Sequence, residues 1–398
     1  MFTILRNADL YAPEACGTSA LVIGGGHLLW VGPDGELPRV ELPADERDLA
    51  GARVVPGLVD GHAHTTGGGG EAGAETRVPA PELSAYTLHG VTSVVGMLGT
   101  DAETRSMAEV LASVRALRAE GLSAWCLTGG YHLPPATLTG SLRGDLTHLD
   151  AVVGVGELAL SDFRSSQPTI DELLRVASEV QVGAMLAGKA GVLHLHLGDG
   201  ARGLELVRAA LDHSELPARL FHPTHVNRRR GLFDEALALA ERGVTVDVTA
   251  FPVHGELPPD ELAPAEAVRR FLDAGLDPAR LTLSSDSGGC LPRFDADGRL
   301  THMDVGAAAG LLGTLADLVA GGLPLERVLP LVTSNPADQY GLRGSFHPKG
   351  RLCAGADADL LVLDESGRAT DVMARGRWLV RGGDALVRGT FEADPTPA

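Results

Sequence analysis

From Val54 onward, the sequence alternates short apolar stretches with longer amphipathic ones that end near glycines. Such alternation predicts a parallel sheet whose strands are joined by helical crossovers. Eight stretches read as strands, and eight parallel strands are the number that closes a barrel. They are residues 54–59, 92–98, 123–127, 151–157, 192–196, 220–225, 244–248 and 281–285.

Helical patterns separate these stretches, as a barrel requires. A doubly wound open sheet is the alternative, and it would carry a glycine-rich phosphate-binding loop directly after its first strand. Here Gly67 to Gly70 follow a His-Ala-His tripeptide instead. We therefore predict an α/β fold, a (β/α)8 TIM-type barrel. The helices are expected at 102–120, 170–182, 203–213, 232–242, 263–274 and 305–319.

Short strand patterns return at both ends of the chain. Residues 3–50 contain them between glycine-rich and proline-rich turns, and they reappear after Asn335-Pro336. We expect the two ends to pair into a small β-sandwich module. The predicted domains are 1–52 plus 349–398 for this module and 53–348 for the barrel.

Composition restricts the partners. The 398 residues carry a formal net charge of -19 and only 4% aromatic residues, which disfavours nucleic acid and anionic membranes. No apolar run approaches the ~20 residues of a membrane span, and the first residues lack a signal peptide's regions, so we expect a cytoplasmic protein. The four cysteines are far apart, which argues against a disulfide framework and a cysteine zinc site.

The tripeptide His62-Ala63-His64 follows the first apolar stretch. Side chains alternate along a strand, so the two imidazoles point the same way and can hold one metal ion between them. Fourteen histidines will also produce such pairs by chance. The ends of the other predicted strands decide between these readings.

In a parallel barrel, side chains at the C-terminal strand ends gather at one face. Four histidines and two carboxylates fall there, a set that suits two zinc-like ions with one carboxylate bridging them. His194 and His222 read as packing residues or as groups behind the ligands. His132 could hydrogen-bond a substrate. The six candidate ligands are His62, His64, Glu157, His196, His225 and Asp286.

Several segments resemble a known family. The His-Ala-His tripeptide, the strand-end histidines and Ser285-Asp286 resemble the amidohydrolase superfamily of metal-dependent barrel hydrolases. Within it, five segments look like the isoaspartyl dipeptidases, and the resemblance covers nearly the whole chain. These segments are Gly67 to Gly73, Leu98-Gly99-Thr100-Asp101, Leu127 to His132, Ser161 to Ser165 and Pro223 to Arg228.

The resemblance implies a binuclear hydrolase that cleaves the isopeptide bond of β-aspartyl dipeptides by attack of a metal-bound hydroxide. It implies two divalent ions, with zinc as the first choice. It also makes Asp286 the group that takes the proton from the water and passes it to the leaving amine, and it places Gly69 and Thr100 at the substrate. We expect a dipeptide as the substrate and a homo-oligomer as the assembly.

The residues agree with such a substrate, which offers one free amine and two carboxylates. Glu71 suits the amine, and the planar guanidinium groups of Arg164 and Arg228 suit the carboxylates. Tyr131 can donate its hydroxyl to the carbonyl oxygen as charge develops there. Alternatively, each arginine pairs with a neighbouring carboxylate such as Asp162.

The chain departs from the family pattern at two positions. Glu157 stands where the familiar enzymes carry a carboxylated lysine, and Cys290 stands where they carry a serine. A glutamate offers the same two-oxygen anion on a shorter stem, so the backbone must approach the metals, which Gly154 and Gly156 would permit. Otherwise, Glu157 lies behind the ligands and water alone bridges the ions. Cys290 puts the fine selectivity for substrates in question.

Other functions stay open. Another amidohydrolase activity is the first alternative: a deaminase, a cyclic-amide hydrolase or an N-acyl amino acid deacylase. The arginines and Glu71 argue against a nucleobase substrate, which has no carboxylates. A non-catalytic barrel scaffold is the second alternative, and the complete set of six candidate ligands argues against it.

Overall fold

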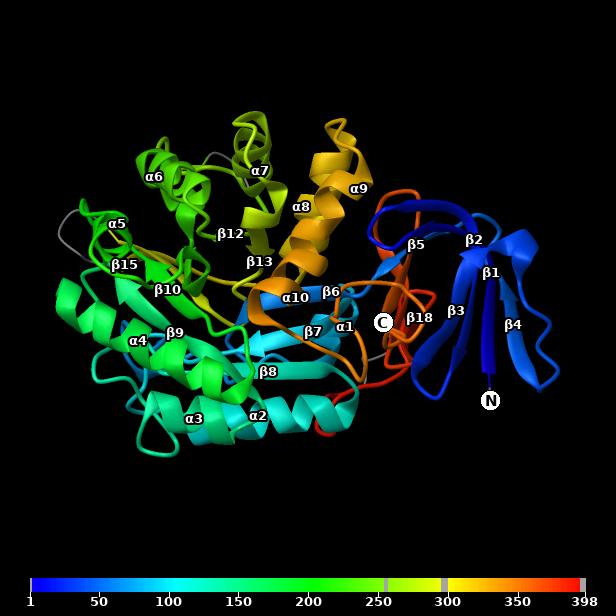
Figure 1. Cartoon of the computed structure of the whole chain (residues 1–398), viewed down its shortest axis with the longest axis horizontal. Coiled ribbons are helices and arrows are strands. Elements are labelled where there is room, and N and C mark those ends of the chain that lie inside the picture. Colours follow the sequence, from blue (N-terminus) through cyan, green and yellow to red (C-terminus); the bar gives the residue numbers. More distant parts are fainter. Residues whose placement is uncertain (1, 254–256, 295–299, 394–398) are drawn as a thin grey trace.

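The computed structural model describes residues 2–253, 257–294 and 300–393. Figure 1 shows a larger body, with strands enclosed by helices, beside a β-sheet body that contains the N-terminal strands. The largest apolar cluster extends from the barrel into the sheet body through residues such as Val55, Leu361 and Val372, and a second cluster lies within the sheet body. The predicted division at 52/53 and 348/349 stays a prediction.

Six parallel strands follow one another in chain order around the larger body. A parallel pair, β12 (Val246–Thr249) and β13 (Leu281–Ser284), continues the series. The ring closes where Ala63 forms a parallel bridge with Ser287. The fold is therefore a (β/α)8 barrel, as predicted. The six strands are β6 (Leu58–Ala63), β7 (Val91–Gly96), β8 (Ser123–Thr128), β9 (Val152–Leu160), β10 (Leu193–Leu197) and β11 (Phe221–Thr224).

Helices cover the outside of the ring (Figure 1). Helix α2 begins at Met107 rather than at 102, because Ser106 and Glu109 form a reciprocal capping box there. Helix α8 begins at Ala309 rather than at 305, because residues before it belong to a hairpin of β14 (Cys290–Phe294) and β15 (Leu300–Val305). The helices are α1 (Leu83–Thr87), α2 (Met107–Glu120), α3 (Leu142–His148), α4 (Ile170–Ala187), α5 (Glu205–Asp212), α6 (Arg230–Glu241), α7 (Pro264–Asp273), α8 (Ala309–Ala320), α9 (Leu325–Val328) and α10 (Ser334–Tyr340).

The second body is a nine-stranded sheet built from both ends of the chain. Its central strand, β5 (Arg53–Pro56), lies parallel to β1 on one side and antiparallel to β16 on the other. The two ends thus belong to one sheet, as expected, but they are joined through β5, which the sequence had assigned to the barrel. The other strands are β1 (Phe2–Tyr11), β2 (Ala15–Gly24), β3 (His27–Pro33), β4 (Ala44–Asp48), β16 (Leu360–Leu363), β17 (Ala369–Ala374), β18 (Arg377–Arg381) and β19 (Asp384–Ala385).

The expectation of one barrel strand at 54–59 is wrong. The stretch divides at Gly57 into β5, which belongs to the nine-stranded sheet, and β6, which belongs to the barrel. Both halves are apolar and buried, so the hydrophobic pattern does not reveal the change of sheet. The barrel strand therefore begins at Leu58 and includes His62.

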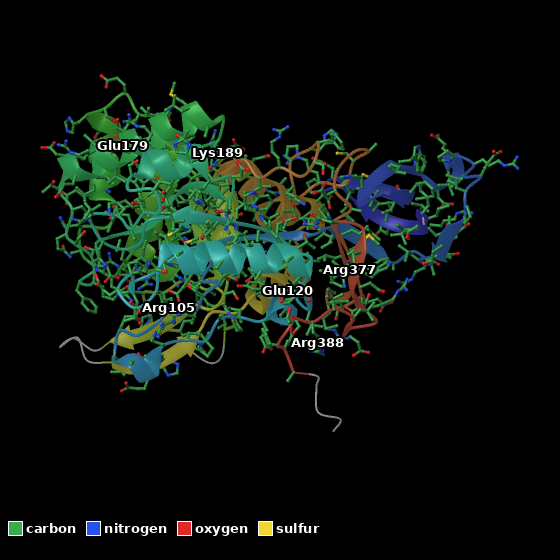
Figure 2. All side chains as sticks on the ribbon, turned by 90° about the horizontal axis from the view of Figure 1, so that it is seen from below. Arg105, Glu120, Glu179, Lys189, Arg377 and Arg388 are labelled. Carbon is green, nitrogen blue, oxygen red and sulfur yellow. The ribbon has the colours of Figure 1, made fainter. Side chains whose placement is uncertain are left out.

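The C-terminal segment returns to the barrel. Thr390 N donates to Glu120 Oε1 at the end of α2 (3.0 Å), and Figure 2 shows Glu120 near Arg388. Ser84 N donates to Glu392 Oε2 (3.2 Å). These contacts tie the last described residues to the barrel. Among the helices described, none has the length and apolar character needed to cross a membrane.

Candidate active site

His62, His64 and Asp286 converge where β6 meets the segment after β13. The Nε2 atoms of the two histidines are 3.4 Å apart, and Asp286 Oδ1 lies 3.4 Å from His62 Nε2 and 3.1 Å from His64 Nε2. Asp60 fixes this arrangement, because its buried carboxylate accepts a hydrogen bond from Ser285 N (3.1 Å). The structure thus brings together three side chains that the sequence predicted as ligands.

Glu157 stands between two pairs of histidines. Its Oε1 lies 3.7 Å from His62 Nε2 and 3.4 Å from His64 Nε2. Its Oε2 lies 3.1 Å from His196 Nδ1 and 3.5 Å from His225 Nε2. One carboxylate therefore faces both halves of the site, which is the arrangement that a bridging ligand needs.

A β-bulge brings Glu157 inward. Val155 pairs with Leu193 and Leu158 with Leu195, so Gly156 and Glu157 share the one position opposite His194. Gly156 has a φ of 151°, and a Cβ there would lie 2.7 Å from His194 O. Glycine is thus required for this bulge, as the sequence suggested. The predicted strand end at Glu157 is wrong, since β9 continues to Leu160.

His196 and His225 complete the set from neighbouring strands. His225 directly follows β11 with a left-handed φ of 60°, and its Nδ1 lies 2.6 Å from Thr249 Oγ1. His196 lies within β10, and its Nε2 is 3.1 Å from Asp162 Oδ2. The ring nitrogens of His196 also contact Tyr131 and Arg164, so other protein groups compete with a metal ion for this histidine.

The donor set fits divalent cations. Two groups of donor atoms lie close enough to hold an ion: His62, His64 and Asp286, and His62, Glu157 and His225. Asp286 Oδ1 and His64 Nδ1 are buried without a hydrogen-bond partner among the described residues. Carboxylates and imidazoles that converge without donors repel one another unless a cation neutralises them. His196 lies outside both groups.

The pKa shifts of two histidines also support a cation at this site. Burial lowers the pKa of His62, but the Glu157 and Asp286 carboxylates outweigh it and raise this pKa to about 9. The site thus favours positive charge between its carboxylates. For His225, burial dominates and lowers the pKa to about 3, which keeps this imidazole neutral and able to act as a ligand.

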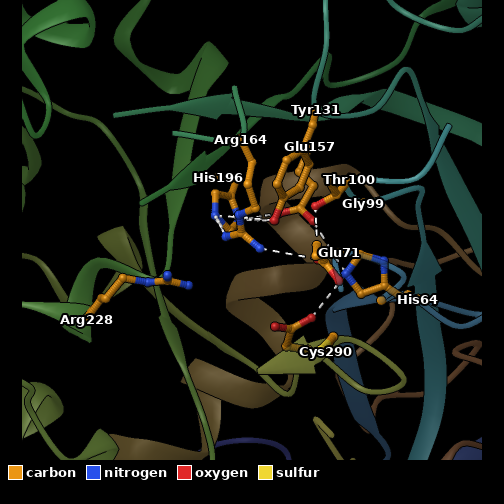
Figure 3. Close-up of a pocket in the computed structure, with 13 residues that line it drawn as sticks. His64, Glu71, Gly99, Thr100, Tyr131, Glu157, Arg164, His196, Arg228 and Cys290 are labelled. Carbon is orange, nitrogen blue, oxygen red and sulfur yellow. Dashed lines mark hydrogen bonds and ion pairs between the residues drawn. The ribbon is translucent and has the colours of Figure 1, made fainter. Parts of the chain in front are cut away.

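A pocket opens above these groups (Figure 3). His62 and His225 lie below its lining. Every other predicted site residue lines it, so the structure brings the whole predicted set together. The lining residues are His64, Gly68, Gly69, Glu71, Gly99, Thr100, Tyr131, Glu157, Arg164, His196, Arg228, Asp286 and Cys290.

Glu71 is nine-tenths buried, with 9% of its side chain exposed. Thr100 Oγ1 donates to its Oε1 (3.1 Å), and Arg164 Nη1 approaches the same oxygen (3.3 Å). Its Oε2 is buried without a hydrogen-bond partner in the described part of the chain. This oxygen can accept a hydrogen bond from a ligand.

The two arginines differ in their surroundings. Arg164 is buried and donates to both oxygens of Asp162, from Nε (3.0 Å) and Nη2 (2.7 Å). Arg228 has 26% of its side chain exposed, lies 3.7 Å from Asp199, and enters the pocket from the side opposite His64 (Figure 3). Each arginine thus has a carboxylate neighbour, and Arg228 is the freer cation.

Tyr131 is buried beside His196, with its hydroxyl 2.7 Å from His196 Nδ1. Its ring also lies 5.5 Å from the Arg164 guanidinium. His132 points elsewhere, because its Nε2 lies 2.9 Å from Arg164 O. The tyrosine hydroxyl is therefore held at the pocket, and the histidine supports the loop that contains Arg164.

Sequence reasoning missed Arg105. Its buried guanidinium donates to Thr66 O, to Gly68 O (2.8 Å) and to Val78 O (3.0 Å). These carbonyls flank the glycine-rich segment that contains Gly69 and Glu71. Arg105 therefore holds the Glu71 loop in place. No local pattern marks this residue, since its partners are distant in sequence.

A family model described as Amidohydrolase family matches residues 53–379, most of the chain. The chain belongs to this family. As a member of the amidohydrolase family it is a hydrolase, and the family's general dependence on metals agrees with the donor groups described above.

Two solved structures are similar to this chain to different degrees. The crystal structure of a beta-aspartyl dipeptidase from Fervidobacterium islandicum AW-1, in complex with beta-Asp-Leu dipeptide, is 39% identical with a TM-score of 0.89. The match covers 97% of this chain and 98% of that one. Dihydropyrimidinase from Brevibacillus agri NCHU1002 (15% identity, TM-score 0.68, covering 98% and 97%) shares the fold.

An imidazolonepropionase is similar to a shorter region of this chain. Imidazolonepropionase of Paracoccus denitrificans (strain Pd 1222) is 37% identical over 117 residues. That region is 29% of this chain and 29% of the imidazolonepropionase, so the chain matches less than a third of that protein's length.

Proposed function

We propose that this amidohydrolase cleaves the isopeptide bond of β-aspartyl dipeptides. The observation that carries the proposal is the free Oε2 of Glu71, a buried carboxylate oxygen beside the candidate metal ligands. A substrate ammonium group would satisfy it with a charge-assisted hydrogen bond. The full-length similarity to a beta-aspartyl dipeptidase supports the same substrate class.

The proposed cofactor is two divalent ions, zinc by preference. His62, His64, His196, His225, Glu157 and Asp286 would hold them, with Glu157 shared. When bound, such ions polarise the scissile carbonyl and lower the pKa of the attacking water. The cytoplasmic location and the homo-oligomer also remain predictions.

The chain's own side chains supply binding and proton transfer. Glu71 would bind the substrate amine, and Arg228, with Arg164 beside it, would bind carboxylates. Tyr131 would donate its hydroxyl to the carbonyl oxygen as negative charge develops. Asp286 would accept a proton from the attacking water and return it to the leaving amine. Gly69, Thr100 and Cys290 would line the substrate.

The proposal is tested with zinc-loaded protein and matched dipeptides. We expect hydrolysis of β-Asp-Leu and none of α-Asp-Leu, because only the β-linkage puts the free amine and carboxylate in the positions that the pocket provides. A cyclic amide and an N-acetyl amino acid serve as comparison substrates. Preferential turnover of either one would replace the dipeptidase function by that alternative amidohydrolase activity.

Glu71→Gln and Arg228→Met are each expected to lower kcat/KM for β-Asp-Leu by about 10- to 100-fold, since a hydrogen bond to a charged group is worth about 1.5–3 kcal/mol. Most of the effect should fall on KM, with a smaller change in kcat if the substrate is misplaced. Steady-state kinetics measures both constants.

Glu75→Gln is the matched control for Glu71→Gln, because Glu75 lies in the same loop but is exposed. Its kinetics should match those of the wild type. An unchanged kcat/KM in Arg228→Met would remove this arginine from the proposed carboxylate site.

A further inference from the structure

A column of buried polar side chains runs from His62 into the barrel interior. His62 Nδ1 lies 2.8 Å from His194 Nε2, and His194 Nδ1 lies 3.0 Å from His222 Nδ1. His222 Nε2 lies 3.0 Å from Thr282 Oγ1, which donates to Asp247 Oδ1 at 2.6 Å. All five side chains are buried, and none of them is among the residues that line the pocket.

The column crosses four strands of the barrel. His194 lies in β10, His222 in β11, Asp247 in β12 and Thr282 in β13. Inward side chains of barrel strands form stacked layers, and apolar residues dominate such layers in this fold. A polar column in that place needs a reason beyond packing, because buried polar groups cost free energy unless they are fully paired.

The Asp247 end fixes the direction of the hydrogen bonds. Besides Thr282, Thr224 Oγ1 (2.7 Å) and Ser284 Oγ (2.5 Å) donate to this carboxylate. A carboxylate that accepts from three hydroxyl groups acts only as an acceptor. The Thr282 hydroxyl hydrogen is therefore committed to Asp247, and the Thr282 oxygen must accept from His222 Nε2.

This constraint determines which ring nitrogen of each histidine in the column carries a proton. Burial lowers the pKa of His222 to about 3, so His222 is a neutral imidazole. It donates from Nε2, and its Nδ1 therefore accepts from His194 Nδ1. His194 then accepts at Nε2, and His62 donates from Nδ1. Tyr340 Oη lies 3.2 Å from both facing Nδ1 atoms and can rotate to suit this order. The neutral form of His62 is then left with an unprotonated Nε2, the atom that faces the candidate ligands.

We propose that His194, His222, Thr282 and Asp247 are positioning residues that hold His62 in the tautomer whose Nε2 is free to bind a cation. The charge of Asp247 polarises the hydrogen bonds between it and His62 and makes the His62 Nε2 a stronger donor to the ion. The inference rests on the proposed metal centre and adds four residues that act only through His62.

The test compares two substitutions of the same kind at one carboxylate. Thr282→Val removes the hydroxyl group that connects His222 to Asp247. Thr224→Val removes a hydroxyl group that also donates to Asp247 but lies outside the column. Zinc affinity, measured by competition with a chromophoric chelator, should fall by about 10- to 100-fold in Thr282→Val and stay close to wild type in Thr224→Val. Equal losses in both variants, or none in Thr282→Val, would overturn the proposal.

Nitrogen NMR of the zinc-loaded wild type gives a second readout that needs no variant. We expect His194 to be protonated on Nδ1 and His222 on Nε2, and the opposite tautomers would overturn the proton order. This outcome is separate from the proposed activity. A protein that binds zinc and shows these tautomers but does not cleave β-Asp-Leu would lose the proposed function and keep this inference.

Discussion

Replacing Asp286 with asparagine is expected to lower kcat by about 10²- to 10⁴-fold, the usual contribution of a general acid or base. The Asp286 carboxylate lies 3.1 Å from His64 Nε2, and burial is outweighed by the nearby histidines, so its pKa is well below the usual range. It is therefore ionised, which is the state that a proton acceptor requires. Asparagine keeps the shape of the side chain and removes the basic oxygen. Steady-state kinetics on β-Asp-Leu measures the loss.

Metal analysis of the same preparation separates chemistry from assembly. We expect Asp286→Asn to retain metal, because histidines and Glu157 remain in place. Asp304→Asn, the same change at an exposed position of β15, serves as the control and should behave like the wild type. A kcat within a few-fold of wild type in Asp286→Asn would show that another group moves the proton.

Glu157→Gln is expected to lower both metal occupancy and turnover. The two oxygens of Glu157 face different histidine pairs, at 3.4 Å from His64 Nε2 and 3.1 Å from His196 Nδ1. An amide removes the negative charge that would be shared between two ions. Loss of a group that merely supports a ligand costs about 10- to 100-fold in affinity, so loss of the bridge should cost more. Metal content after dialysis at defined free zinc measures the effect.

Reloading the metal-free protein with zinc in the absence of bicarbonate distinguishes a glutamate bridge from a carboxylated-lysine bridge. A carboxylated lysine needs carbon dioxide to form, whereas a glutamate does not. Metal-free wild-type protein should therefore regain full activity with zinc in bicarbonate-free buffer. If Glu157→Gln kept two ions and a near-normal kcat, Glu157 would lie behind the ligands and water alone would bridge the ions.

The order of the barrel strands could be predicted because helical patterns separate most of the apolar stretches, although the short helices α1 and α3 were not predicted. This order, with the rule that functional side chains collect at one face, placed His196, His225 and Asp286 near His62 without any contact information. The bulge at Glu157 could also be predicted from the sequence, because two glycines close to a charged residue in a strand are a local signal.

Other features depend on partners that are distant in sequence. The change of sheet at Gly57 could not be predicted from the sequence, since both halves of 54–59 are apolar. Thr282 and Asp247 have no local marker in the sequence, and the role that we propose for them depends on contacts among β11, β12 and β13. His194 was predicted as a packing residue or a group behind the ligands, and its direct contact with His62 is visible only in the three-dimensional arrangement.

The nine-stranded sheet has a consequence for synthesis of the protein on the ribosome. β5 pairs with β1 early in the chain, but its other neighbour, β16, begins only at Leu360. Chains grow from the N-terminus at about 5–20 residues per second, so the nascent chain exposes this open strand edge while the whole barrel is being made. An open edge is a template for pairing with another chain. The barrel therefore has to fold beside an incomplete sheet, and the last strands to be translated are the ones that seal it.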